Sequence, residues 1–154
     1  MIPRGILLHR CETGATGAAV KAAEAKQGLG YHFFIRRDGT VDALYPPSDV
    51  VWHALTWSRS CIGIALHGDF HPPDKSRNCL PTAAQKAALI TLVLDLWKAY
   101  GVLPLMGHTD LPGASTDPQK VCPGANLDVR ALQAQTFAAH VLLISSGTAS
   151  VGQV

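Results

Sequence analysis

Two histidines and a cysteine, drawn from three separate segments, are the side chains best suited to carry chemistry in this sequence. His9 ends a short apolar run, His108 follows Gly107, and Cys122 lies in a stretch rich in proline and glycine. Zinc in a catalytic site is bound by three nitrogen, sulfur or oxygen ligands and keeps one position open for water. The three side chains are compatible with such a site. On residue type and spacing alone, a structural role for each is the more common case, because an isolated cysteine usually packs as a small apolar group.

The segment that holds Cys122 is irregular. Residues 108–124 contain three prolines and two glycines, so regular structure cannot run through them. Loops of this length are uncommon in compact domains and are usually functional. A metal ion bound through Cys122 would fix this loop in place.

The elements that must position these residues can be predicted from the pattern of apolar residues. Apolar runs between turn-forming residues predict strands over 6–9, 31–36, 40–44, 61–66 and 102–106. The first run ends at His9 and the last leads to His108. The run 61–66 is almost continuously apolar, which predicts a central strand buried on both faces. A short connection containing Gly39 joins the second and third runs and predicts a hairpin.

Helices are predicted over 17–27, 83–100 and 127–144. Thr16 is a suitable N-cap for the first of them. The second has the strongest signals, because Thr82 and Gln85 can form a capping box and Gly101 stands at the C-cap position. Helical spacing of apolar residues predicts the inward faces, which are Ala87, Ile90, Val93, Leu94 and Trp97 in the second helix and Val129, Leu132, Phe137 and Val141 in the third.

Strands that alternate with helices, together with a hairpin, predict a single α/β domain with a central mixed β-sheet flanked by helices. We assign residues 1–144 to this domain and predict a flexible C-terminal tail over 145–154. A chain of 154 residues is long enough for one hydrophobic core, and its 47% hydrophobic and 16% charged residues exclude a disordered protein. A formal net charge of +2 is too small to indicate nucleic acid as a partner.

Neither export nor membrane insertion is indicated by the sequence. Apolar runs stay well short of the roughly 18 residues that a membrane span needs. The first residues lack the apolar segment and cleavage site of a signal peptide, so we expect synthesis in the cytoplasm. The four cysteines, Cys11, Cys61, Cys79 and Cys122, are expected to be reduced there, and their pairing stays open.

Several segments, taken in order, resemble the motifs of one known family. They are Ile6-Leu7-Leu8-His9, the Gly-Tyr-His-Phe run at 30–33, Trp52-His53-Ala54 with Cys61-Ile62-Gly63-Ile64, Gly107-His108-Thr109-Asp110, and Lys120-Val121-Cys122-Pro123. They are similar to those of the zinc-dependent N-acetylmuramoyl-L-alanine amidases and peptidoglycan-recognition proteins, in particular the small phage lysozyme-type amidases. The resemblance covers nearly the whole chain. It implies the α/β fold of that family and hydrolysis of the amide between N-acetylmuramic acid and L-alanine in bacterial peptidoglycan.

The resemblance also implies a role for each site residue. His9, His108 and Cys122 would hold Zn²⁺, which polarises the amide carbonyl and lowers the pKa of a bound water. Tyr31 would stand beside the metal, where its phenol holds the attacking water or the tetrahedral centre. Lys120 would place its ammonium at the oxyanion, a charge that develops only in the transition state.

Three further residues are interpreted through the same resemblance. His53 matches a family histidine that either contacts the substrate or supports a metal ligand. His32 is expected to be structural, because neighbouring side chains of a strand point to opposite faces and Tyr31 takes the face of the site. Cys61 replaces the serine that is usual in the family, a departure that affects substrate contacts rather than the metal.

Three other functions compete with the amidase. A muropeptide-binding module of the same fold typically lacks the third metal ligand, whereas Cys122 is present here. A cytosolic recycling amidase uses a carboxylate in that place. A structural metal or disulfide domain without catalysis needs a closed four-ligand metal site, and the motifs supply no fourth ligand. We therefore expect a monomeric, endolysin-like amidase that acts on the cell wall after release or delivery from the cytoplasm.

Overall fold

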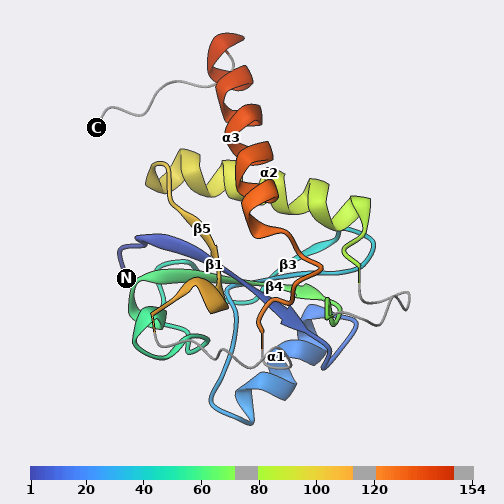
Figure 1. The fold of residues 1–154 in the computed structure, drawn as a ribbon. Helices are drawn as coiled ribbons and strands as arrows, with labels where there is room; N and C mark the ends of the chain where they lie inside the picture. Colours follow the sequence, from blue (N-terminus) through green and yellow to red (C-terminus); the bar gives the residue numbers. More distant parts are fainter. Residues whose placement is uncertain (72–79, 113–120, 148–154) are drawn as a thin grey trace.

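The computed structural model describes residues 1–71, 80–112 and 121–147. One mixed sheet of five strands runs through the molecule in the order β3-β2-β4-β1-β5 (Figure 1). The strands are β1 (Gly5–Cys11), β2 (Phe33–Ile35), β3 (Val41–Ala43), β4 (Cys61–His67) and β5 (Leu105–Gly107). The predicted α/β fold class is confirmed, and β4 lies at the centre of the sheet as its apolar sequence predicts.

The pairing of the strands explains where they differ from prediction. β1 pairs in parallel with both β4 and β5, and it extends past His9 to Cys11 because its whole length is paired with β4. The predicted hairpin is present, since β2 and β3 are antiparallel. Both hairpin strands are shorter than predicted, so Tyr31 and His32 precede β2 rather than belonging to it.

The three predicted helices are present as α1 (Gly17–Ala25), α2 (Ala83–Tyr100) and α3 (Val129–Ser145), and two short 3₁₀ helices, η1 (Leu55–Arg59) and η2 (His108–Asp110), lie in the connections. Capping residues set the helix starts. The Thr16 hydroxyl accepts a hydrogen bond from the Ala19 N–H at 3.3 Å, and Thr82 and Gln85 form the predicted capping box. α1 ends at Ala25, earlier than predicted.

Alternate residues of β1 point to the two faces of the sheet. Ile6 and Leu8 join the main hydrophobic core, which α2 and α3 cover. Leu7, His9 and Cys11 point to the other face, where α1 and the loops between strands lie (Figure 1). The ligand candidate on β1 therefore lies on the side of the sheet opposite the two long helices.

The predicted inward face of α3 is wrong in its second half. Leu132 is buried and Val129 partly buried, but Phe137 and Val141 are 52% and 46% exposed. The second half of this helix extends past α2 and away from the sheet (Figure 1). Phe137 and Val141 therefore lie beyond the layer that their spacing predicts them to cover.

The inward face of α2 is rotated from the prediction. Its buried residues are Gln85, Leu89, Val93, Leu96 and Trp97, which confirms Val93 and Trp97, whereas Ala87 is exposed and Ile90 and Leu94 are partly buried. The Gln85 amide donates hydrogen bonds to the carbonyls of Ile35 at 3.3 Å and His67 at 3.0 Å. These bonds turn a polar residue toward the sheet, which a purely apolar pattern does not predict.

Several sequence predictions fall at or beyond the limits of the described residues. Ser145 is the last residue of α3, and most of the predicted tail over 145–154 lies outside the described residues, so the domain boundary stays a prediction. Cys79 is outside as well, whereas Cys11, Cys61 and Cys122 are free thiols. None of the described helices combines the length and apolar character that crossing a bilayer requires.

Candidate metal centre

His9 lies between two small hydrophobic clusters on the α1 side of the sheet. Toward the end of β1, Cys11 packs in a cluster with α1. Toward its start, Leu7 packs with Ala54 and Leu111. Between these clusters the His9 imidazole is 2% exposed, so both of its nitrogens must find partners inside the protein.

The three predicted ligands come together in space. One ligand atom each of His9, His108 and Cys122 lies within 4.8 Å of the others. The Cys122 Sγ is 3.5 Å from His9 Nδ1, and the His9 and His108 ring centroids are 5.0 Å apart in an edge-on arrangement. His108 is placed directly after β5 by η2, whose Asp110 carboxylate accepts the Gly107 N–H at 2.7 Å.

The irregular loop around Cys122 is held by its backbone. The Cys122 carbonyl accepts hydrogen bonds from the Thr109 N–H at 3.0 Å and the Thr109 hydroxyl at 3.2 Å, which ties it to the residue after His108. The Asn126 N–H donates to the Phe70 carbonyl at 2.9 Å. Gly124 has a φ of +109°, and a Cβ at this position would lie 2.4 Å from the Phe70 oxygen, so glycine is required there.

His53 determines which nitrogen of His9 faces the other ligands. Its Nε2 is 3.1 Å from the Cys61 carbonyl, which can only accept, so His53 carries its proton on Nε2. Its Nδ1 then accepts from His9 Nε2–H at 3.0 Å. This leaves the lone pair of His9 Nδ1 directed at Cys122, as a metal ligand requires. His53 is 8% exposed and bonded to His9, so it can support this imidazole, and its predicted contact with the substrate stays a prediction.

The position of the His53 ring explains why the Cys-Ile-Gly-Ile motif has a glycine, Gly63. A Cβ on Gly63 would lie 2.8 Å from the His53 ring, so a larger residue would displace it. The Ser58 hydroxyl accepts the N–H groups of His53 at 3.0 Å and Ala54 at 2.9 Å, which fixes the backbone beside the ring.

The three histidines of the site are neutral at physiological pH. Burial lowers the pKa of His9 well below its usual value, with further lowering from His53 and His108. Burial lowers the pKa of His53 to about 4 and also lowers that of His108. Neutral imidazole is the form that binds a metal. Burial raises the pKa of the Cys122 thiol, an effect opposed by a hydrogen bond from the Arg10 backbone and by the Arg10 charge.

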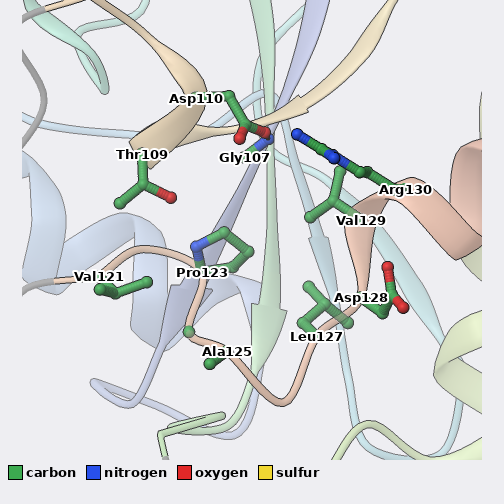
Figure 2. Close-up of a pocket in the computed structure, with 11 residues that line it drawn as sticks. Gly107, Thr109, Asp110, Val121, Pro123, Ala125, Leu127, Asp128, Val129 and Arg130 are labelled. Atoms are coloured by element: carbon green, nitrogen blue, oxygen red, sulfur yellow. Dashed lines mark hydrogen bonds between the residues drawn. The ribbon is translucent and has the colours of Figure 1, made fainter. Parts of the chain in front are cut away.

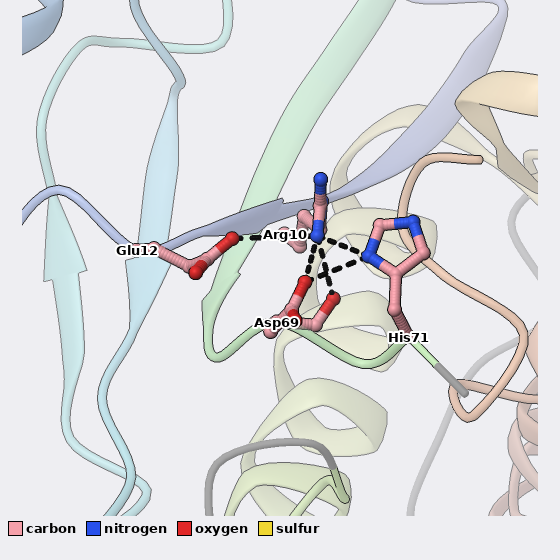
Figure 3. Close-up of polar contacts among 4 residues, drawn as sticks. All are labelled: Arg10, Glu12, Asp69 and His71. Carbon is pink, nitrogen blue, oxygen red and sulfur yellow. Dashed lines mark hydrogen bonds and ion pairs between the residues drawn. The ribbon is translucent and has the colours of Figure 1, made fainter. Parts of the chain in front are cut away.

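Arg10, the residue after His9, was missed by the sequence reasoning. Its guanidinium forms ion pairs with Asp69 and with Glu12, the latter at 3.3 Å, and contacts His71 (Figure 3). Asp69 and His71 flank Phe70, whose carbonyl holds the Cys122 loop. Arg10 therefore connects β1 to the loop that supports the third ligand. A charged residue directly after a buried ligand histidine is the sequence signal that could have identified it.

Tyr31 lies beside His9, near enough to Cys122 to feel its charge. The ring centroids of Tyr31 and His9 are 5.2 Å apart. Burial, followed by the charge of Glu24, raises the pKa of the Tyr31 phenol, so it remains protonated and can donate a hydrogen bond. Glu24 is a buried residue of α1 that accepts a hydrogen bond from the Thr13 hydroxyl at 3.2 Å, and nothing in a helix of alanines predicts its burial beside Tyr31.

Of the two remaining residues, His32 has a structural role and Lys120 is not described. His32 is fully buried, and its Nδ1 accepts the Gly63 N–H at 2.9 Å while Nε2 donates to the Asp49 carbonyl at 3.2 Å, which is a structural role. The predicted reason, alternation along a strand, is wrong because His32 lies before β2. Lys120 lies outside the described residues, so its role stays a prediction.

A separate pocket lies beside the ligand loop. It is lined by neighbours of the ligands and by the start of α3, among them Thr109, Asp110, Val121, Pro123 and Arg130 (Figure 2). His9, His108 and Cys122 do not line it. This pocket is therefore adjacent to the metal centre and distinct from it.

Fold and site together define a class of protein: a small α/β domain with a candidate His-His-Cys metal site on one face of a mixed sheet. Comparison with known proteins makes the assignment specific. The profile of the N-acetylmuramoyl-L-alanine amidase family (Amidase_2) matches residues 1–125. The chain belongs to this family.

One phage endolysin and two solved structures illustrate what the chain is similar to. The endolysin of Klebsiella phage KP32 is 33% identical over 99 residues, which cover 64% of this chain and 61% of that protein. The match thus spans about three fifths of this relative's length. Among solved structures, the N-acetylmuramoyl-L-alanine amidase LysCS of Clostridium intestinale has 28% identity and a TM-score of 0.73, covering 87% of this chain and 83% of that one. Drosophila peptidoglycan-recognition protein SA shares the fold, with a TM-score of 0.63 at 18% identity over 86% and 78% of the two chains.

Proposed function

We propose that this chain is a zinc-dependent, endolysin-like N-acetylmuramoyl-L-alanine amidase. Its substrate is bacterial peptidoglycan, in which it hydrolyses the amide between N-acetylmuramic acid and L-alanine. The observation that carries the proposal is the convergence of His9, His108 and Cys122, whose ligand atoms lie within 4.8 Å of one another. Family membership supplies the reaction.

The residues present fit zinc. Two neutral imidazoles and one thiolate are donors that zinc prefers, and a thiol of raised pKa still ionises on binding the metal. Structural zinc sites are closed by four protein ligands, whereas the cluster found among the described residues has three. A three-ligand site keeps a position for water, which favours a catalytic centre. The presence of the third ligand, Cys122, also argues against a non-catalytic muropeptide-binding module.

The proposed roles follow from position. A bound Zn²⁺ would supply Lewis acidity and a water of lowered pKa. Tyr31, held as a neutral phenol beside His9, donates a hydrogen bond toward the reacting centre. Lys120 is proposed to stabilise the oxyanion. His53 orients His9 through their shared hydrogen bond.

Metal content and end-group release test the proposal together. Protein purified without added metal is expected to contain about one zinc per chain. Cys122→Ser should lose most of this zinc and its activity, while Cys61→Ser, at a buried thiol outside the cluster, should keep both. Digestion should release new amino termini from peptidoglycan. Appearance of new reducing sugar ends instead would assign the chain to glycosidases and overturn the proposal.

A further inference from the structure

One side of α3 exposes a row of apolar side chains in the second half of the helix. Phe137, Val141 and Leu142 are 52%, 46% and 70% exposed. Ala134 and Ala138 are exposed as well. These five residues recur at three- and four-residue intervals, so they lie on one side of the helix. They are here called the apolar face of α3.

The apolar face lies at the edge of the molecule. The ring centroid of Phe137 is 6.2 Å from that of Trp97, and the His140 ring packs on the same indole at 5.5 Å, so α2 holds the helix at this point. Beyond it, α3 extends past α2 and away from the sheet (Figure 1). A second molecule can therefore reach the apolar face without meeting the rest of the domain.

The candidate metal site does not explain this exposure. Leu132 and Val129 of α3 pack on the main core, whereas His9 points to the opposite face of the sheet. The family profile matches residues 1–125 and ends before α3 begins. The apolar face therefore belongs to a part of the chain that is separate from the site.

The composition of the helix restricts what can cover the apolar face. Residues 131–147 contain no Asp, Glu, Lys or Arg. A helix that lies on a membrane surface typically carries Lys and Arg on its polar face, and a charged partner would need opposite charges here. An uncharged apolar face is complementary to a copy of itself, which is what a twofold symmetric interface requires. The net charge of +2 gives two copies little mutual repulsion.

The area of the apolar face suits a weak dimer. Phe137, Val141 and Leu142 together expose roughly 300 Å², the size of the largest apolar patch on a typical monomer, which is often functional. Two such faces, with the exposed alanines and the polar residues at their margins, approach the total of about 1,000 Å² that a specific interface needs. An interface at this lower limit predicts association in the micromolar range.

We propose that two copies of this chain associate through the apolar faces of their α3 helices, which pack antiparallel about a twofold axis. Antiparallel packing brings opposite ends of the two helix dipoles together. The small side chains of Ala134 and Ala138 let the helices approach closely. The candidate metal site of each copy lies across the sheet from this interface and stays accessible. The proposal does not depend on the proposed function, and it differs from the monomer expected from the sequence.

Sedimentation velocity of the purified, metal-containing full chain at increasing concentration tests the dimer. The mass is expected to rise from the 16.3 kDa of one chain toward twice that value. Val141→Glu should weaken association by about tenfold or more, because like charges that face each other across an interface are strongly unfavourable. Val50→Glu is the matched control, since this valine of the β3–β4 connection is 49% exposed against 46% for Val141. It should associate like the parent.

Both variants should keep their zinc and their circular dichroism spectrum, and Leu142→Glu carries the test if Val141→Glu does not fold. A parent that keeps the mass of one chain at about 100 µM, above the range expected for this interface, would overturn the proposal. Equal weakening by Val50→Glu would overturn it too. A monomeric parent that binds vesicles of phosphatidylethanolamine and phosphatidylglycerol, and loses this binding in Val141→Glu, would assign the face to lipid instead. Dimers that form only after residues 148–154 are deleted would assign it to those residues.

Discussion

At the residue scale, the hydrogen bonds that link the Cys61 carbonyl, His53 and His9 determine which nitrogen of His9 faces Cys122. The two histidines are 44 residues apart in sequence, so no local pattern connects them. The ligands themselves could be named from motifs, because each motif is a short stretch of sequence. The tautomer of His9 depends on a carbonyl of a neighbouring strand, and sequence does not contain that information.

Replacing His53 tests whether these hydrogen bonds orient His9. His53→Ala is expected to weaken zinc affinity by roughly 10- to 100-fold, as loss of a residue supporting a metal ligand typically does. Competition with a chromogenic chelator measures the affinity. His140→Ala, on α3 against Trp97, is the control and should leave affinity unchanged. Equal zinc affinity in His53→Ala and the parent would mean that His9 is oriented without it.

The neutral histidines also predict how stability depends on pH. The pKa of His53 falls from 6.5 to about 4 on folding, so between these values the unfolded chain binds a proton that the folded chain does not. Stability of the metal-free protein should therefore decrease as pH falls from about 6.5 toward 4, by about 1.4 kcal/mol per unit for this group. Urea unfolding at pH 7, 6 and 5 measures the trend. A His53→Asn variant should show a shallower slope, and stability that rises toward pH 5 would contradict the assignment.

Tyr31 and Lys120 are expected to act on turnover and not on the metal. Tyr31→Phe and Lys120→Ala should retain zinc but lose about 10²- to 10³-fold in kcat, because neither is a ligand and both act on charge that develops later. Steady-state hydrolysis of purified peptidoglycan, with zinc content measured on the same samples, separates the two effects. Lys120→Ala with nearly parental turnover would show that this residue is a solvated loop lysine.

At the scale of elements, local signals were reliable and partner-dependent ones were not. The limits of α2 could be predicted because its capping box and Gly101 are local. Its buried face could not, because Gln85 is drawn inward by carbonyls of β2 and β4. Likewise, the spacing of Phe137 and Val141 is helical, but whether a sheet lies beneath them depends on where α3 crosses α2.

The loop of the third ligand yields a prediction at this scale. Gly124→Ala should destabilise the loop, since its Cβ would meet the Phe70 oxygen at 2.4 Å and its φ is +109°. We expect a loss of roughly 1–3 kcal/mol in the free energy of unfolding and weaker zinc binding. Gly28→Ala is the matched control, with a φ of +69° and open space around the added Cβ. It should keep zinc affinity; the same affinity in Gly124→Ala would show that this contact does not position Cys122.

At the scale of the whole molecule, the main hydrophobic core and the candidate metal ligands lie on opposite faces of the sheet. One face carries the main core under α2 and α3, and the other carries the candidate metal site and α1 (Figure 1). The α/β class and the central strand could be predicted from alternating apolar runs. The convergence of three segments on one face required the parallel register of β1 with β4 and β5, which the sequence pattern does not specify.

Mass spectrometry of digested peptidoglycan tests the central claim most directly. The account predicts intact stem peptides with a free L-alanine amino terminus and uncut glycan strands, with products absent after chelation and restored by added Zn²⁺. Products cleaved within the glycan or within the stem peptide, or the same products at the same rate after the metal has been removed, would contradict it.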